Sequence, residues 1–161
     1  MGNRDHWLVS EVVLREVTSE NWRAVAAVAP KPEQSAHVMP VTYYLCLCHY
    51  GAVWHPLAVS RDDAVAGFVM WGVDETDGSH WIGGLVIEAG RQQQGIGRAT
   101  VESLVRRLAE SQNARRFALS YSLSNTVARD LYARFGFRET GEVEDDELVA
   151  RLELPPRTER V

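Results

Sequence analysis

Cysteine is scarce in this sequence, which contains only Cys46 and Cys48 among its 161 residues. One residue separates the two thiols, and this spacing matches neither a disulfide framework nor a zinc knuckle. His49 follows directly, but a free cysteine in an apolar stretch usually packs as a small hydrophobic side chain. We therefore expect reduced thiols and no metal site.

Long apolar runs are also absent. The most apolar stretch, 41–59, is interrupted by two histidines, a glycine and a proline. A membrane-spanning helix would need about 20 consecutive apolar residues. The first six residues lack the apolar core of an export signal, and His6 stands where an acylation signal requires Ser or Thr. These features predict a cytoplasmic protein.

An excess of basic residues is missing as well. The chain has 17 Lys and Arg residues against 22 Asp and Glu residues, which gives a formal charge of -5 and a pI near 5.5. This sign disfavours nucleic acid and anionic membranes as partners and favours a cationic one. With 45% hydrophobic and 24% charged residues, the composition is that of a globular protein. The length predicts one domain over 1–161, with flexible ends at 1–9 and 155–161.

The hydrophobic period changes along the chain and predicts an α+β fold. The first half is expected to contain a strand in 11–17, a helix in 20–29, a helix in 33–50 broken near Pro40, and strands at 53–59, 64–73 and 81–87. Short turns join these three strands, which favours an antiparallel meander. The second half is expected to contain a helix at 96–109, a strand at 117–121, a helix at 125–135 ended by Gly136, and a hairpin of 137–143 and 147–154.

A glycine-containing loop, Gln92-Gln93-Gln94-Gly95-Ile96-Gly97, lies between a predicted strand and a predicted helix. Glycines let backbone N–H groups approach an anion, and the helix start adds unpaired donors and the positive end of its dipole. A pyrophosphate fits such a loop, although a plain tight turn would have the same pattern. A P-loop is disfavoured because Arg98-Ala99 follows Gly97, and a dinucleotide-binding motif is disfavoured because Thr100 replaces its third glycine.

These residues carry a resemblance to a known family. The loop, the helix after it, and then Asn125, Ala128, Leu131-Tyr132 and Gly136-Phe137 resemble the GCN5-related N-acetyltransferase (GNAT) superfamily. The resemblance implies a mostly antiparallel twisted sheet of about seven strands flanked by about four helices. Within the superfamily the chain is most similar to bacterial spermine/spermidine acetyltransferases. The shared segments are Asn21-Trp22, Glu33-Gln34, Pro56-Leu57-Ala58, Gly67-Phe68-Val69-Met70, His80-Trp81-Ile82, Leu119-Ser120-Tyr121 and Thr140-Gly141-Glu142.

The resemblance implies acetyl-CoA as the co-substrate, direct attack by a primary amine in a ternary complex, and a set of residues around the co-substrate. The Ile87 N–H would donate to the thioester carbonyl, and the Tyr132 phenol would act as general acid towards the departing thiolate. Asn125 would contact the CoA arm, or it would simply cap its own helix. Spacing alone favours Tyr132 as a core aromatic beside Leu131 and Phe135, and the family motif favours the catalytic role instead. The acetyl-CoA-binding residues implied are Leu85, Val86, Ile87, Gln92, Gln93, Gln94, Gly95, Ile96, Gly97, Arg98, Asn125 and Tyr132.

The general base is the least defined part of the site. Several relatives carry a Glu on the strand before the CoA site, whereas this chain has Trp81, Gly83 and Gly84 there. An aliphatic amine has a pKa near 10.4 and must lose a proton before it attacks. The candidates to accept that proton, directly or through water, are His80, Glu88, Glu142 and Glu147.

Two acidic turns, 74–77 and 142–147, suggest a cationic acceptor such as spermidine or spermine. Another small amine, an aminoglycoside or a protein amine stays open as the acceptor, as does an acetyl-CoA sensor without turnover. The resemblance also makes a homodimer an expectation. The residues expected to contact the acceptor are Glu33, Trp54, Glu75, His80, Trp81, Glu142 and Glu147.

Overall fold

A computed structural model of the chain describes residues 11–158. Its strands are β1 (Val13–Glu16), β2 (His55–Arg61), β3 (Ala64–Val73), β4 (His80–Ile87), β5 (Arg116–Tyr121), β6 (Arg138–Glu144) and β7 (Glu147–Glu153). Its helices are α1 (Trp22–Ala26), α2 (Val41–Gly51), α3 (Ile96–Ser111) and α4 (Thr126–Phe135), with short 3-10 turns η1 (Pro32–Gln34) and η2 (Ala89–Arg91). The mixed α/β fold class is confirmed. The expected flexible end at 1–9 lies outside the described residues, as do 159–161.

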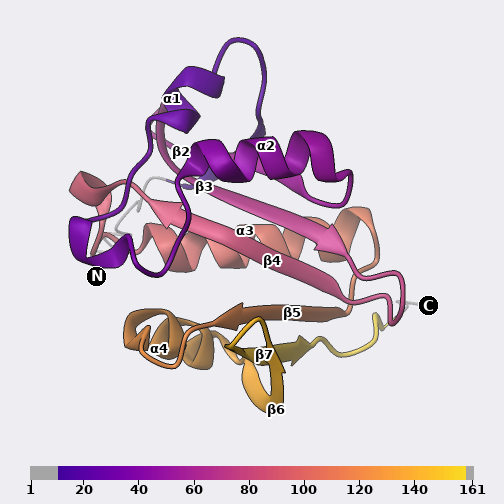
Figure 1. Cartoon of the computed structure of the whole chain (residues 1–161). Helices are drawn as coiled ribbons and strands as arrows, with labels where there is room; N and C mark the ends of the chain where they lie inside the picture. The colour runs from indigo at the N-terminus through magenta and orange to yellow at the C-terminus, as the bar shows by residue number, and fades with distance from the viewer. Residues whose placement is uncertain (1–10, 159–161) are drawn as a thin grey trace, which may run out of the picture.

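The seven strands form one sheet in the order β1-β2-β3-β4-β5-β7-β6. Every neighbouring pair is antiparallel except β4 and β5, which are parallel. Helices cover both faces (Figure 1). One face packs against α1 and α2 through Val25, Val41 and Cys48, and the other packs against α3 and α4 through a larger apolar cluster that includes Leu104 and Tyr132.

Two helices are shorter than the sequence pattern predicts. The helix expected over 20–29 is only α1, and the segment expected as a broken helix over 33–50 divides into η1 and α2. Proline explains the second difference, because Pro40 has no N–H to donate and stands as the N-cap of α2 with an extended backbone. Residues 35–40 therefore form a non-helical segment that crosses to the site described below.

The sheet opens between β4 and β5. These parallel strands pair only at His80 with Phe117 and at Trp81 with Ala118. Figure 1 shows the two strands separating towards their carboxyl ends. The carboxyl half of β4 is therefore hydrogen-bonded to β3 on one side and has no strand on the other.

A bulge in β4 lies at the point where the strands separate. From Phe68 to Met70 the chain advances two residues along β3, while the paired positions on β4, Val86 and Gly83, are three apart. Gly84 adopts φ +60°, a left-handed conformation that favours glycine. Because the extra residue lies on β4, the bulge changes which backbone groups of the strand face the open side.

Candidate active site

The carboxyl end of β4 presents backbone groups to the opening in the sheet. Antiparallel pairs alternate between hydrogen-bonded and non-hydrogen-bonded positions. Glu88 donates its N–H to the Ala66 carbonyl at 2.9 Å, so the preceding pair, Gly67 with Ile87, is non-hydrogen-bonded. The Ile87 N–H and C=O therefore point away from β3 and into the opening. Consistent with this direction, the Ile87 carbonyl accepts a hydrogen bond from Gln92 Nε2 at 3.0 Å.

The glycine-containing loop follows this edge. Gln93 and Gly95 both have positive φ, +60° and +76°, and nothing lies within 4 Å of the position that a Cβ on Gly95 would occupy. Gly95 is the N-cap of α3 and has no side chain to bond the first N–H groups of the helix. Within residues 11–158, the N–H groups of Gly95, Ile96, Gly97 and Arg98 have no protein acceptor. The loop thus offers a row of unpaired donors at the positive end of a helix of 16 residues.

A cavity of about 610 Å³ joins the β4 edge to this loop. Its walls include most of the residues that the resemblance assigns to acetyl-CoA, with additions from the segment before α2. Those predicted residues are Leu85, Val86, Ile87, Gln92, Gln93, Gly95, Ile96, Gly97, Asn125 and Tyr132. Gln94 and Arg98 do not line it; the Gln94 side chain instead accepts from Arg61 Nη1 at 3.4 Å.

Two predicted residues come from α4. Asn125 is the N-cap, and its Oδ1 accepts from the Ala128 N–H at 3.3 Å, so the capping role considered from the sequence is confirmed. Its side-chain NH2 makes no hydrogen bond within the described residues and Asn125 lines the cavity, so capping leaves the amide donors available. Gly136 ends the helix at φ +114°, as its position predicts.

Tyr132 is held by aromatic packing. Its ring stacks on Tyr121 at 5.9 Å between centroids and meets Phe137 edge-on, and the side chain is 7% exposed. Within the part of the chain that is described, the hydroxyl makes no hydrogen bond to protein. Burial, together with the charges of Tyr121 and Glu147, raises the pKa of the Tyr132 phenol well above its usual value. The phenol therefore keeps its proton at any physiological pH.

A second cavity, of about 350 Å³, adjoins the first and shares Leu85, Asn125 and Tyr132 with it. Three carboxylate residues, Glu144, Asp145 and Glu147, line it together with aromatic side chains, and no Lys or Arg does. The aromatic residues of this wall are Tyr44, Trp54, Trp81, Tyr121 and Tyr132. The second cavity is thus suited to a cation with an apolar body.

Neighbouring side chains leave little room for side chains on β4 at Gly83 and Gly84. A Cβ on Gly83 would lie 3.2 Å from the Trp54 ring and 3.2 Å from the Met70 methyl group. A Cβ on Gly84 would lie 3.3 Å from the Tyr44 ring. The aromatic side chains of α2 and the segment after it therefore fill the space that side chains on the strand would need.

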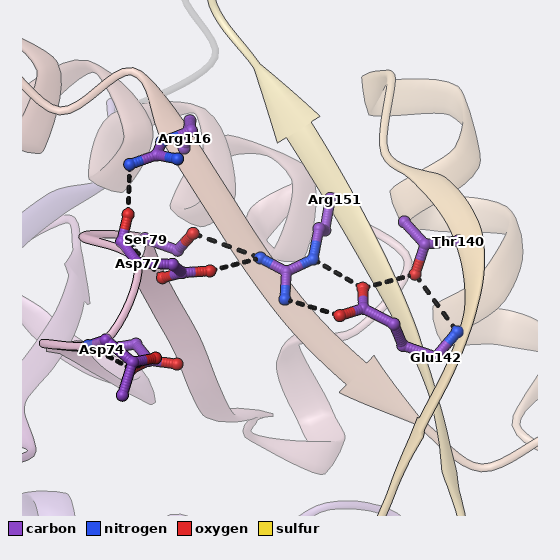
Figure 2. A network of polar contacts seen from close by, with 8 residues as sticks. Asp74, Asp77, Ser79, Arg116, Thr140, Glu142 and Arg151 are labelled. Carbon is purple, nitrogen blue, oxygen red and sulfur yellow. Dashed lines mark hydrogen bonds and ion pairs between the residues drawn. The ribbon is translucent and has the colours of Figure 1, made fainter.

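The acidic residues expected around the acceptor separate into two groups. Glu142 and Asp77 are both bound by Arg151, at 2.7 Å and 3.2 Å, at the opposite end of β4 (Figure 2). Hydrogen bonds from Ser79 lower the pKa of Asp77, and the Arg151 and Thr140 side chains lower that of Glu142. Glu75 is exposed in the turn between β3 and β4, outside both cavities.

The remaining predicted residues also differ in position. His80 is buried between Trp71 and Phe117, and its Nε2 contacts Gln112 Oε1 at 3.0 Å. Glu88 accepts from the Ala29 N–H at 3.2 Å, and Glu33 lines the first cavity. Of the four candidate bases, Glu147 is the one in the second cavity, where its Oε2 accepts from Ser120 Oγ at 2.7 Å.

Sequence reasoning missed several residues of the site. Gln34, Tyr44, Ser120 and Tyr121 line the cavities, but none of them was assigned to the site. Gln34, Ser120 and Tyr121 lie in segments that carry the family resemblance, and this was the one signal that could have found them; Tyr44 lies in none. They reach the site from α2, β5 and the segment before α2. The described residues contain no group of three or more His, Cys, Asp or Glu side chains that could hold a metal ion, and none of their helices is long and apolar enough to cross a membrane.

Comparison with known proteins identifies the family. Residues 15–137 match the model of the acetyltransferase (GNAT) family, and the chain therefore belongs to this family of acyltransferases. The chain is 28% identical over 142 residues to the spermine/spermidine N(1)-acetyltransferase of Bacillus subtilis (strain 168), a match that covers 81% of this chain and 90% of that protein.

Solved structures share the fold at lower identity. An aminoglycoside acetyltransferase in complex with coenzyme A superposes with a TM-score of 0.73 at 17% identity, covering 89% of this chain and 95% of the other. The ribosomal-protein-S18-alanine N-acetyltransferase from Escherichia coli gives 0.68 at 20% identity, covering 93% and 98%. The chain is an N-acetyltransferase by family, and enzymes of this fold use acetyl-CoA.

Proposed function

We propose that this chain transfers an acetyl group from acetyl-CoA to a primary amine of a polyamine such as spermidine or spermine. The observation that carries the proposal is the pair of adjoining cavities that meet at Tyr132. One has unpaired backbone donors suited to an anionic co-substrate, and the other has carboxylates and aromatic rings suited to a cationic acceptor. This division matches the two substrates of an acetyltransferase.

Acetyl-CoA fits the first cavity on two observations. The unpaired N–H groups from Gly95 to Arg98 would bind its pyrophosphate. The β4 edge from Leu85 to Ile87 has no neighbouring strand and would bond an extended arm as an added strand. When bound, acetyl-CoA supplies the acetyl group as an activated thioester.

The protein groups where the two cavities meet would stabilise the developing charge and transfer protons. The Ile87 N–H points into the opening and would donate to a carbonyl oxygen that gains negative charge. The Tyr132 hydroxyl keeps its proton and Tyr132 lines both cavities, which supports a role in which it would protonate a departing sulfur. Glu147, directly or through water, would take a proton from the acceptor ammonium, and the neutral amine that results would attack the thioester carbonyl.

The acceptor assignment rests on the charge and shape of the second cavity. Three carboxylates without a lining Lys or Arg attract a polycation, and the faces of Trp54 and Trp81 suit its methylenes and ammonium groups. The relative from Bacillus subtilis is named for the same acceptors.

The test is release of CoA thiol from acetyl-CoA by the purified protein with spermine, spermidine, putrescine, a lysine peptide and an aminoglycoside in parallel. We expect the highest kcat/KM with a polyamine. A preference for the peptide or the aminoglycoside would keep the acetyltransferase chemistry and reject the polyamine. No release with any of these amines would reject the proposed acceptor class as a whole.

A further inference from the structure

A reciprocal pair of carboxamides links the segment before α2 to the acetyl-CoA edge. Gln34 Nε2 donates to Gln92 Oε1 at 2.9 Å, and Gln92 Nε2 donates back to Gln34 Oε1 at 2.7 Å. The two residues are 58 positions apart in sequence. Both side chains are partly buried in the wall of the first cavity, where water competes less well for their hydrogen bonds.

Every strong polar atom of the Gln92 side chain is used in this arrangement. The second N–H of Gln92 Nε2 donates to the Ile87 carbonyl at 3.0 Å, on the edge of β4 that faces the cavity. Gln34 Oε1 also accepts from the Lys31 N–H at 3.1 Å. The Gln92 carboxamide is thus fixed in orientation by Gln34 on one side and by β4 on the other.

Gln92 also stands at a junction of the backbone. It follows η2 directly and precedes Gln93, the first positive-φ residue of the glycine-containing loop. Its side chain bonds the end of β4, while its backbone begins the loop that presents unpaired N–H groups. The Gln92 side chain therefore links these two parts of the acetyl-CoA site to each other.

We infer that Gln34 is a positioning residue, which acts through Gln92 to hold the Ile87 edge and the glycine-containing loop in register for acetyl-CoA. This inference rests on the proposed function for the identity of the ligand. Gln34 belongs to the loop between α1 and α2 and touches none of the reacting atoms. Substitution of Gln34 should therefore change the affinity for CoA and the chemical environment of the Ile87 carbonyl group.

The test compares Gln34→Met, which keeps the side-chain length without hydrogen-bonding groups, with wild type. Three hydrogen bonds are lost, two with Gln92 and one from the Lys31 N–H, so the Kd of CoA measured by calorimetry should rise about five- to tenfold. Without any ligand, the NMR resonance of the Ile87 carbonyl carbon should shift as the bond from Gln92 weakens. Ser35→Ala is the matched control, because it removes only the local bond from Ser35 Oγ to the Pro32 carbonyl.

A double-mutant cycle separates positioning from a general loss of structure. In a Gln92→Met background, Gln34→Met should leave the Kd of CoA within twofold. Equal effects in both backgrounds would overturn the inference, as would an unchanged Kd and Ile87 resonance in the single variant. If Gln34→Met does not fold, Gln34→Asn, with a carboxamide one methylene shorter, gives the same test.

These measurements need no acceptor amine, so the role of Gln34 and the proposed function can be rejected independently of each other. If Gln34→Met weakens CoA binding as expected but wild type does not acetylate polyamines, the role of Gln34 stands and the polyamine acceptor is rejected. If wild type acetylates polyamines but Gln34→Met binds CoA like wild type, the acceptor stands and the role of Gln34 is rejected. If wild type bound no CoA, the proposed function would be rejected. The Ile87 carbonyl resonance would still show whether Gln34 acts on Ile87 through Gln92.

Discussion

The two ends of β4 differ in what surrounds them. At the amino end, His80 and Trp81 pair with β5, and the neighbouring carboxylates of Asp77 and Glu142 are both bound by Arg151 (Figure 2). At the carboxyl end the strand has no partner on the β5 side, and Glu147 has no cation bound to it within residues 11–158. Paired groups stabilise the fold, whereas unpaired groups are left available to ligands.

Removal of the phenol is expected to have the largest effect at the open end. Tyr132→Phe should lower kcat about 10²- to 10³-fold, because a general acid contributes on this scale. The hydroxyl makes no bond to described protein groups, so the melting temperature should change little. Steady-state CoA release and thermal unfolding check both parts.

Because the pKa of Tyr132 is raised, kcat should show no alkaline decline from this group up to pH 10. Near-normal kcat in the variant would remove Tyr132 from the chemistry.

A charge placed in the glycine-containing loop should have the next largest effect. Gly95→Asp brings a carboxylate to the start of α3, where it would repel a phosphate and weaken CoA by roughly 30-fold, or about 2 kcal/mol. Gly141→Asp is a matched control, since Gly141 also has positive φ, +85°, and open space at its Cβ. Calorimetric CoA affinity equal in the two variants would reject the loop as the phosphate site.

The two acidic groups can be compared directly. Glu147→Gln should raise the KM for spermidine and lower kcat at neutral pH, together about tenfold in kcat/KM, because it removes an unpaired charge from the second cavity. Glu142→Gln removes a carboxylate already bound by Arg151 and should leave kcat/KM within twofold. Equal losses in both variants would show that overall negative charge matters, rather than the cavity.

The smallest effect is expected at the closed end. Arg151→Met should lower the melting temperature at pH 7 by about 2–4 °C, because its ion pairs are partly exposed and modest in strength. Asp77 and Glu142 have folded pKa values below their usual ones, so their contribution is complete above about pH 5 and is lost as pH falls through the folded values. The difference between variant and wild type should accordingly vanish in acid. Thermal unfolding from pH 7 to pH 2 measures this, and a constant difference would contradict the linkage.

Local sequence patterns predicted much of the fold because they reflect local physics. Residues 64–73 form an apolar, β-branched and aromatic run between two turns, and β3 has these bounds. Gly136 ends α4 in the left-handed conformation expected of it. The failures are at α1 and η1, where apolar spacing suggested longer helices than the prolines and the packing allow.

The site could be predicted only in part, for the same reason. Residues in the continuous stretch from Leu85 to Gly97 are neighbours in sequence and line one cavity, as the loop pattern indicated. Glu142 and Glu147 are also near one another in the chain, but they lie on different strands of a hairpin. Glu142 forms an ion pair with Arg151, whereas Glu147 lines the second cavity.

By itself, the sequence determined the order of elements, the glycine-containing loop and the acidic character of the chain, because helix periodicity, glycine conformations and net charge are local or additive properties. Only the tertiary structure decided which carboxylates are neutralised, where the sheet opens, and that Gln34 meets Gln92 across 58 residues. Those outcomes depend on strand register and on the bulge in β4, which bring distant residues together through packing that no local pattern encodes.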